Sequence, residues 1–142
     1  MKKRILSIIS GLILISLFAV SCSDKKGTDP TTTPNKGIQT YQGDWKIEGK
    51  DINGQTMSGT INIDANGTIT GNAYGIIGPG DSITKDKITD KGNETYEINM
   101  SEYNMNMIYE FTFANNDSGT WKVFVSLNGN KQESASGTLT RQ

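Results

Sequence analysis

The residues able to do chemistry are few in this sequence of 142 residues. It contains one cysteine, Cys22, and no histidine. A catalytic serine or cysteine normally depends on a neighbouring histidine as its base, and zinc sites are built from cysteine and histidine. The composition therefore excludes Ser–His and Cys–His catalysis and the usual zinc sites. We expect no bound metal and no cofactor.

Carboxylates are the remaining candidates for acid–base chemistry. Four glutamates lie near one another in the sequence, Glu94, Glu97, Glu102 and Glu110. Each lies among polar residues that alternate with apolar ones, a pattern that places it on the solvent side of a strand. A catalytic carboxylate pair is the alternative interpretation. We predict a solvated face and a protein that is not an enzyme.

Cys22 follows a segment with the features of an export signal. Residues 1–4 are MKKR, and residues 5–20 form an apolar run that is interrupted by serine and glycine and is short for a membrane-spanning helix. The residues "AVSC" resemble a bacterial lipobox, in which small residues precede a cysteine that is lipidated and becomes the new N-terminus. The resemblance implies a lipoprotein signal peptide at residues 1–21 and lipid attachment at Cys22.

Residues 22–40 predict a flexible linker. They are rich in Thr, Pro, Lys, Asp and Gly and hold almost no large apolar side chain, so burial cannot offset the entropy of ordering them. Two or three acyl chains on Cys22 would hold the protein firmly on a membrane. The resemblance therefore implies a lipid-anchored protein of the bacterial cell envelope, at the outer membrane, whose domain faces the periplasm or the cell surface.

Residues 41–142 have the length of one small domain with a modest core. They contain 8 Lys and Arg against 13 Asp and Glu, which gives a net charge of −5. An acidic surface repels nucleic-acid phosphates and anionic lipid headgroups. We therefore expect no nucleic-acid partner and no headgroup-binding surface.

Short runs of alternating apolar and polar residues fill this domain, separated by turn sequences such as "DANG" and "NGNK". They predict eight strands, near residues 43–50, 55–64, 68–77, 82–89, 94–102, 105–114, 119–128 and 132–141. Consecutive hairpins with one apolar face each close most economically into a barrel without open edges. We predict an all-β fold, a small eight-stranded antiparallel up-and-down barrel, with a two-sheet β-sandwich as the alternative.

The first and last predicted strands carry a second resemblance. Gly43-x-Trp45 opens the first strand, and Arg141 ends the last. This arrangement is similar to the lipocalin and calycin signature, in which the tryptophan lies across one end of an eight-stranded barrel and a basic residue of the final strand packs over it. The resemblance implies a lipocalin-like barrel at residues 41–142, with Arg141 against the Trp45 ring. The domain is shorter than typical lipocalins and lacks their disulfides.

The inside of such a barrel is either filled by its own side chains or holds one small molecule. Small residues on three strands, among them Gly59, Gly71 and Gly137, would face a wall of larger ones. That wall comprises Met100, Met105, Met107, Tyr109, Phe111 and Trp121. One interpretation is large-against-small packing that fills the space. The other is an apolar cavity lined by methionines and aromatic rings, with those six residues as its candidate ligand contacts.

Two functions follow from this interpretation. The first is the binding of a small apolar ligand by a non-catalytic domain anchored to the membrane through Cys22. The alternative is a protein interaction module of the cell envelope, such as a protease inhibitor or an assembly partner, which would use loops at the barrel mouth. The polar loops do not identify a protein partner.

Overall fold

The computed structural model describes residues 36–73, 75–102 and 105–142. The predicted signal peptide, Cys22 and the predicted linker as far as residue 35 lie outside the described residues. Among the residues that the structure describes, no helix is long and apolar enough to cross a membrane.

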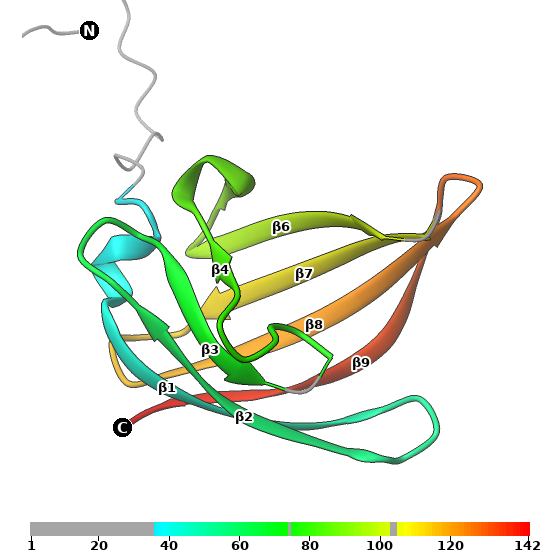
Figure 1. Ribbon diagram of the computed structural model, residues 1–142, viewed down its shortest axis with the longest axis horizontal. Helices are drawn as coiled ribbons and strands as arrows, with labels where there is room; N and C mark the ends of the chain where they lie inside the picture. Colours follow the sequence, from blue (N-terminus) through cyan, green and yellow to red (C-terminus); the bar gives the residue numbers. More distant parts are fainter. Residues whose placement is uncertain (1–35, 74, 103–104) are drawn as a thin grey trace, which may run out of the picture. The chain divides into compact units, whose positions relative to one another are not determined.

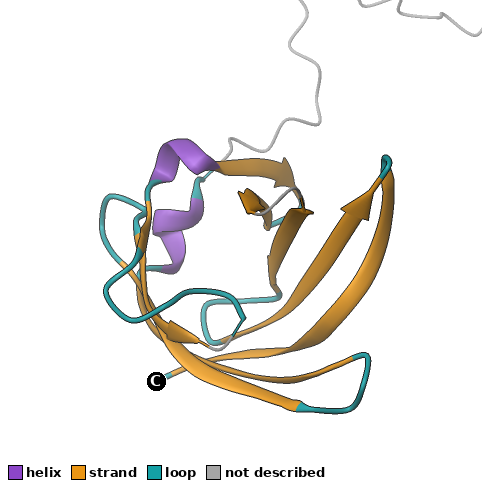
Figure 2. Cartoon of the chain, turned by 45° about the vertical axis from the view of Figure 1, so that its right-hand side comes forward, coloured by secondary structure: helices purple, strands orange, loops and turns teal. Residues whose placement is uncertain are grey.

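The described residues form one antiparallel sheet of nine strands (Figure 1). The strands are β1 (Gly43–Asp51), β2 (Thr56–Ile63), β3 (Ile69–Ala73), β4 (Ser82–Ile83), β5 (Ile88–Gly92), β6 (Thr95–Glu102), β7 (Met105–Phe113), β8 (Ser118–Leu127) and β9 (Asn130–Arg141). Their order is β4-β3-β2-β1-β9-β8-β7-β6-β5, so β1 and β9 are paired. Figure 2 shows the sheet curling into a nearly closed barrel. Because the strands form one continuous sheet, the β-sandwich alternative is wrong.

The predicted number of eight strands is wrong at one place. The strand expected at residues 82–89 is divided into β4 and β5, with the 3-10 helix η2 (Lys85–Lys87) between them. Ile83 pairs with β3, and Ile88 pairs with β6. The two isoleucines are an odd number of residues apart, so an unbroken strand would point them to opposite faces. The helix corrects the phase, and both side chains pack in the core.

Strand β3 ends at Ala73, before the predicted end at residue 77. The backbone N–H groups of Ile76 and Ile77 both donate to the carbonyl of Ala73, at 2.9 and 3.0 Å, and close a tight turn. Gly75 has a φ of +74° in this turn, a conformation that glycine adopts without strain. As a result, Ile76 and Ile77 are buried.

The folded domain begins before Tyr41. Ile38–Tyr41 form a second 3-10 helix, η1, in which Ile38 and Tyr41 are buried. A Cβ on Gly67 would lie 3.2 Å from Cγ2 of Ile38, so η1 packs against the turn between β2 and β3. The predicted linker is therefore too long, because its last residues belong to the domain.

The core lies inside the barrel and follows the alternation of the strands. In β1, for example, Trp45 and Ile47 are buried while Asp44, Lys46 and Glu48 are exposed. Twenty-one hydrophobic residues are buried in total among the described ones, and none of the polar or charged ones is. The core is therefore formed by apolar and aromatic side chains in the described part of the chain.

Candidate functional site

One end of the barrel is covered by η1, and we call it the packed end. Trp45 is fully buried there, and its Nε1–H donates to the carbonyl of Tyr41 at 2.8 Å. The guanidinium carbon of Arg141 lies 5.3 Å from the centre of the Trp45 ring, within cation–π range. Arg141 also donates from Nη2 to the carbonyl of Gln42. Gly43 has a φ of +131°, which a residue with a side chain rarely adopts.

Aromatic rings fill the space beneath η1. The Tyr41 ring stacks on Phe113 at 3.9 Å, and Phe113 meets Trp45 and Tyr96 edge-on at 4.9 and 5.9 Å. The Tyr41 hydroxyl donates to Oε2 of Glu94 at 2.6 Å. Burial, followed by this hydrogen bond, raises the pKa of Tyr41, and burial raises the pKa of Tyr96 to about 12. Both phenols are therefore neutral at physiological pH.

The middle of the barrel is filled by a tryptophan lying on two glycines. Gly49 of β1 pairs with Gly137 of β9, and Trp121 of β8 pairs with Gly137 on the other side. A Cβ on Gly49 would lie 2.6 Å from Cζ2 of Trp121, too close for any side chain. The Trp121 Nε1–H donates to the carbonyl of Glu48 at 3.3 Å. Large-against-small packing, one of the two interpretations of the sequence, describes this layer.

A cavity of about 590 Å³ lies where β3 and β6 diverge, and we call it the seam cavity. Strand β3 pairs with β4 only at Ile69 and Thr70, and the pairing of β6 with β5 ends at Ile98. Beyond these residues no described strand joins β3 to β6. The cavity is lined by Asn72, Ala73, Gly75, Ile76, Ile77, Gly78, Pro79, Asp81, Ser82, Ile83, Met100, Met107 and Tyr109.

Two methionines and a tyrosine form one wall of the seam cavity. Met100 and Met107 are cross-strand partners on β6 and β7, and both are half-buried against the core. The Tyr109 hydroxyl donates to the carbonyl of Gly75 at 3.0 Å and so ties β7 to the turn after β3. It also lies 3.7 Å from Sδ of Met107. The opposite wall is the Ala73–Ile77 turn, whose isoleucines are held by its own backbone bonds.

Three of the six predicted cavity residues line the seam cavity, namely Met100, Met107 and Tyr109. The other three do not. Phe111 and Trp121 are 1% exposed in the packed core, and Met105 is 47% exposed at the start of β7. In all six, the alternation along the strand directs the side chain to the inner face of the barrel. The pairing of the strands then decides which of the six pack against other side chains.

The second wall of the cavity is not among the predicted ligand contacts. The alternation places Ile76 and Ile77 in a strand that ends at residue 77, and it gives Ile83 no role in ligand contact. Two adjacent apolar residues after Gly75 and before "GPGD" are a signal that could have indicated a turn, because an alternating strand cannot bury both.

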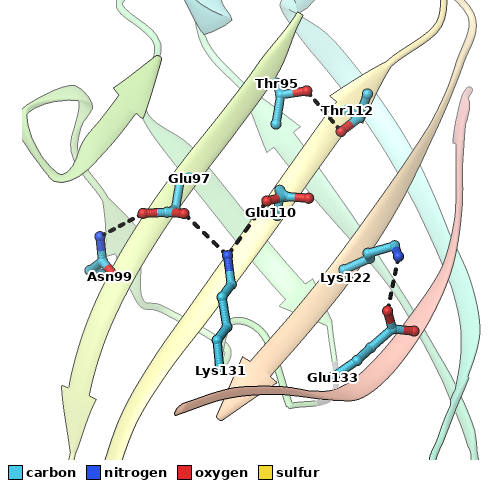
Figure 3. Close-up of polar contacts among 8 residues, drawn as sticks. All are labelled: Thr95, Glu97, Asn99, Glu110, Thr112, Lys122, Lys131 and Glu133. Carbon is cyan, nitrogen blue, oxygen red and sulfur yellow. Dashed lines mark hydrogen bonds and ion pairs between the residues drawn. The ribbon is translucent and has the colours of Figure 1, made fainter. Parts of the chain in front are cut away.

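Two of the acidic residues considered for catalysis, Glu97 and Glu110, lie on the outer face of the barrel (Figure 3). Glu97 and Glu110 are cross-strand partners on β6 and β7. Their Oε2 atoms lie 3.4 and 3.7 Å from Nζ of Lys131, which pairs with both. Glu94 binds the Tyr41 hydroxyl instead. Within the described part of the chain, no group of three acidic, cysteine or histidine residues could hold a metal ion.

The fold is a small, nearly closed antiparallel barrel, and the seam cavity lies in its wall. No protein-family model matches the sequence, and no curated protein matches it. Two solved structures are similar in fold. One is a redesigned β-barrel, 22% identical, with a TM-score of 0.49 over 74% of this chain and 95% of that one. The other is EF1p2_mFAP2b bound to DFHBI, 16% identical, with a TM-score of 0.50 over 76% and 98%.

Proposed function

We propose that this protein is a non-catalytic binding protein that holds a small, mainly apolar ligand in the seam cavity. The observation that carries the proposal is the cavity itself, about 590 Å³ in volume. Pockets for small molecules usually measure about 300–1,000 Å³ and combine an apolar lining with a few polar groups. Met100, Met107 and the isoleucines supply the apolar lining. Asn72, Asp81 and Ser82 supply the polar groups.

The flexibility of methionine suits this role. Its unbranched thioether side chain adapts to ligands of different shape. The Tyr109 hydroxyl bonds to the carbonyl of Gly75, so the methionine side of the cavity is tied to the turn that forms the opposite wall. The structural neighbour solved bound to DFHBI is a precedent for a small ligand on this fold, while the ligand of this chain depends on its own lining residues.

The proposal includes export and lipid attachment. The lipobox-like "AVSC" supports acylation of Cys22 and residence in the bacterial envelope, at the outer membrane. Replacing Cys22 with serine should move the protein from the membrane fraction to the soluble fraction.

The binding proposal is tested with native mass spectrometry of the full chain after incubation with an envelope lipid extract. A reproducible added mass is expected. Met107→Trp, which places an indole inside the seam cavity, should abolish it. Met105→Trp is the matched control, because Met105 is on the same strand outside the cavity. The proposal is wrong if no mass is added, or if both variants keep the ligand.

A protein interaction role is the second candidate, and one observation favours it. Strand β6 extends to Glu102, but its pairing with β5 stops at Ile98. The remaining residues leave one strand edge that pairs with no described strand, and an extended peptide of a partner could add to it. Hydrogen exchange separates the two candidates. A peptide partner should protect the amides of residues 99–101, whereas a cavity ligand should protect those of residues 75–78.

A further inference from the structure

The seam cavity carries one charged side chain among its lining residues, that of Asp81. No lysine or arginine lines the cavity. The five ion pairs found among the described residues use other carboxylates, so Asp81 has no cationic partner within them. A carboxylate at the rim of an apolar pocket without a positive partner favours a cation at that place.

The chain fixes this carboxylate at the rim. Gly78, Pro79, Gly80 and Asp81 form a tight turn, in which the N–H of Asp81 donates to the carbonyl of Gly78 at 3.1 Å. Gly80 has a φ of +89°, as the third position of a type II turn requires after proline. The turn therefore holds Asp81 at a defined position between the loop and β4 (Ser82–Ile83).

The side chain of Asp81 folds back over the turn. A Cβ on Gly78 would lie 2.6 Å from Oδ2 of Asp81, so a side chain at residue 78 would displace the carboxylate. Gly78 itself lines the seam cavity. The absence of a side chain at this position thus leaves the carboxylate beside the cavity rather than turned away from it.

The cavity wall also suits a positive charge next to an apolar body. The face of an aromatic ring attracts cations, and thioether sulfur is a soft, polarizable group. Tyr109 brings an aromatic ring, and Met100 and Met107 bring two thioethers, to the lining of the cavity. The domain as a whole is acidic, with a net charge of −5 over residues 41–142, which adds a long-range attraction for cations.

Building on the proposed function, we propose that the ligand of the seam cavity has a compact apolar body and a cationic group, an amine or a guanidinium, that pairs with Asp81. The apolar body lies between the methionine wall and the isoleucine turn. The cation lies at the rim, where it remains partly in water. An ion pair in such a position changes affinity by roughly twofold to fivefold.

The test uses three probes that share one naphthalene body, namely naphthylmethylammonium, naphthylmethanol and naphthylacetate. Their affinities for the full chain are measured by fluorescence at neutral pH and low salt. The cation should bind about two- to fivefold more tightly than the alcohol, and the anion most weakly. In Asp81→Asn the cation should lose its preference while the alcohol keeps its affinity. Added salt should reduce the preference in the natural protein.

Asp117→Asn is the matched control. It removes the same charge from an exposed turn at the packed end, between β7 and β8, and should leave all three affinities unchanged. Equal binding of the cation and the alcohol, or a preference that survives in Asp81→Asn, would overturn the role of Asp81 while leaving the cavity as a binding site. Failure of all three probes to bind would overturn the proposed function as well.

Discussion

The packed end and the seam cavity are built from the same kind of strand position, yet only one of them is filled. At the packed end, Trp45 and Phe113 lie among neighbouring rings at 4.9 Å, under a helical turn that covers them. At the seam cavity, Met100 and Met107 also face inward, but about 590 Å³ beside them is empty of protein. Alternation along a strand therefore selects the inner face without deciding how it is filled.

Strand pairing explains the difference. Around Trp45, β1 is paired with β2 on one side and with β9 on the other. The aromatic side chains there pack inside an unbroken part of the sheet. Around Met100, the pairing of β6 with β5 has already ended at Ile98. Beyond Ile98 the barrel wall is a loop. The backbone of a loop follows its own turn geometry and not the hydrogen-bonding pattern of the sheet. Stability is thus expected to depend on the packed end and binding on the seam cavity.

The largest expected effect is that of truncating the central ring at the packed end. Trp45→Ala should lower the free energy of unfolding by roughly 3–5 kcal/mol, because it removes a fully buried indole and leaves a cavity. Met107→Ala should cost only about 1–2 kcal/mol, since that side chain is partly exposed beside an existing cavity. Urea unfolding of both variants measures the contrast. Equal losses would show that the two regions are packed alike.

The second prediction concerns the glycine layer below Trp121. A Cβ on Gly137 would lie 2.0 Å from the carbonyl oxygen of Glu48 and 2.6 Å from Cα of Gly49, so the backbone has to move. Gly137→Ala should therefore destabilise the domain by about 1–3 kcal/mol. Thr138→Ala, on the exposed side of the same strand, should change stability by less than about 0.5 kcal/mol. If Gly137→Ala were neutral, the close approach of β1 and β9 would be unimportant.

The packed end should also limit stability at high pH. The pKa of Tyr41 is raised by burial and by Glu94, and that of Tyr96 is raised by burial to about 12, from an ordinary value of 10.0. Below pH 10 both phenols are protonated in the folded and in the unfolded protein, and the stabilisation is complete. Between pH 10 and 12 the unfolded chain loses phenol protons that the folded domain keeps, so stability falls as pH rises.

Unfolding midpoints measured from pH 9 upward check this expectation, with tyrosinate absorbance recorded in parallel. Tyr41→Phe should make the loss of stability with pH less steep, because one of the shifted phenols is gone. Met107→Ala serves as the comparison at the seam cavity and should leave the slope unchanged. A slope that is the same in all three proteins would mean that these phenols do not govern alkaline unfolding.

Much of the fold could be predicted from local sequence. Period-two alternation and Asn-Gly turns predict most strands to within a few residues, and the resemblance to the lipocalin signature implies the contact between Trp45 and Arg141. The structure contains that contact. These features depend on neighbouring residues or on the closure of the barrel, which a chain of hairpins with one apolar face each already requires.

The seam cavity could be predicted only in part, because it depends on where strands cease to pair. The odd spacing of Ile83 and Ile88 and the adjacent Ile76 and Ile77 break the alternation, and each marks a place where the chain leaves the sheet. The sequence shows these breaks but not that they fall opposite Met100. That juxtaposition is a long-range property, since residues 76 and 100 belong to different hairpins.

The smallest expected effect tests whether Arg141 only covers the packed end. Arg141→Gln removes a cation–π contact with Trp45 and the hydrogen bond to the carbonyl of Gln42, so stability should fall by about 0.5–1 kcal/mol. Affinity for the naphthalene probes should not change, because Arg141 is not among the residues that line the seam cavity. Fluorescence titration and urea unfolding of one sample measure both quantities. A change in affinity would mean that the two regions are coupled through the barrel and are not independent parts of it.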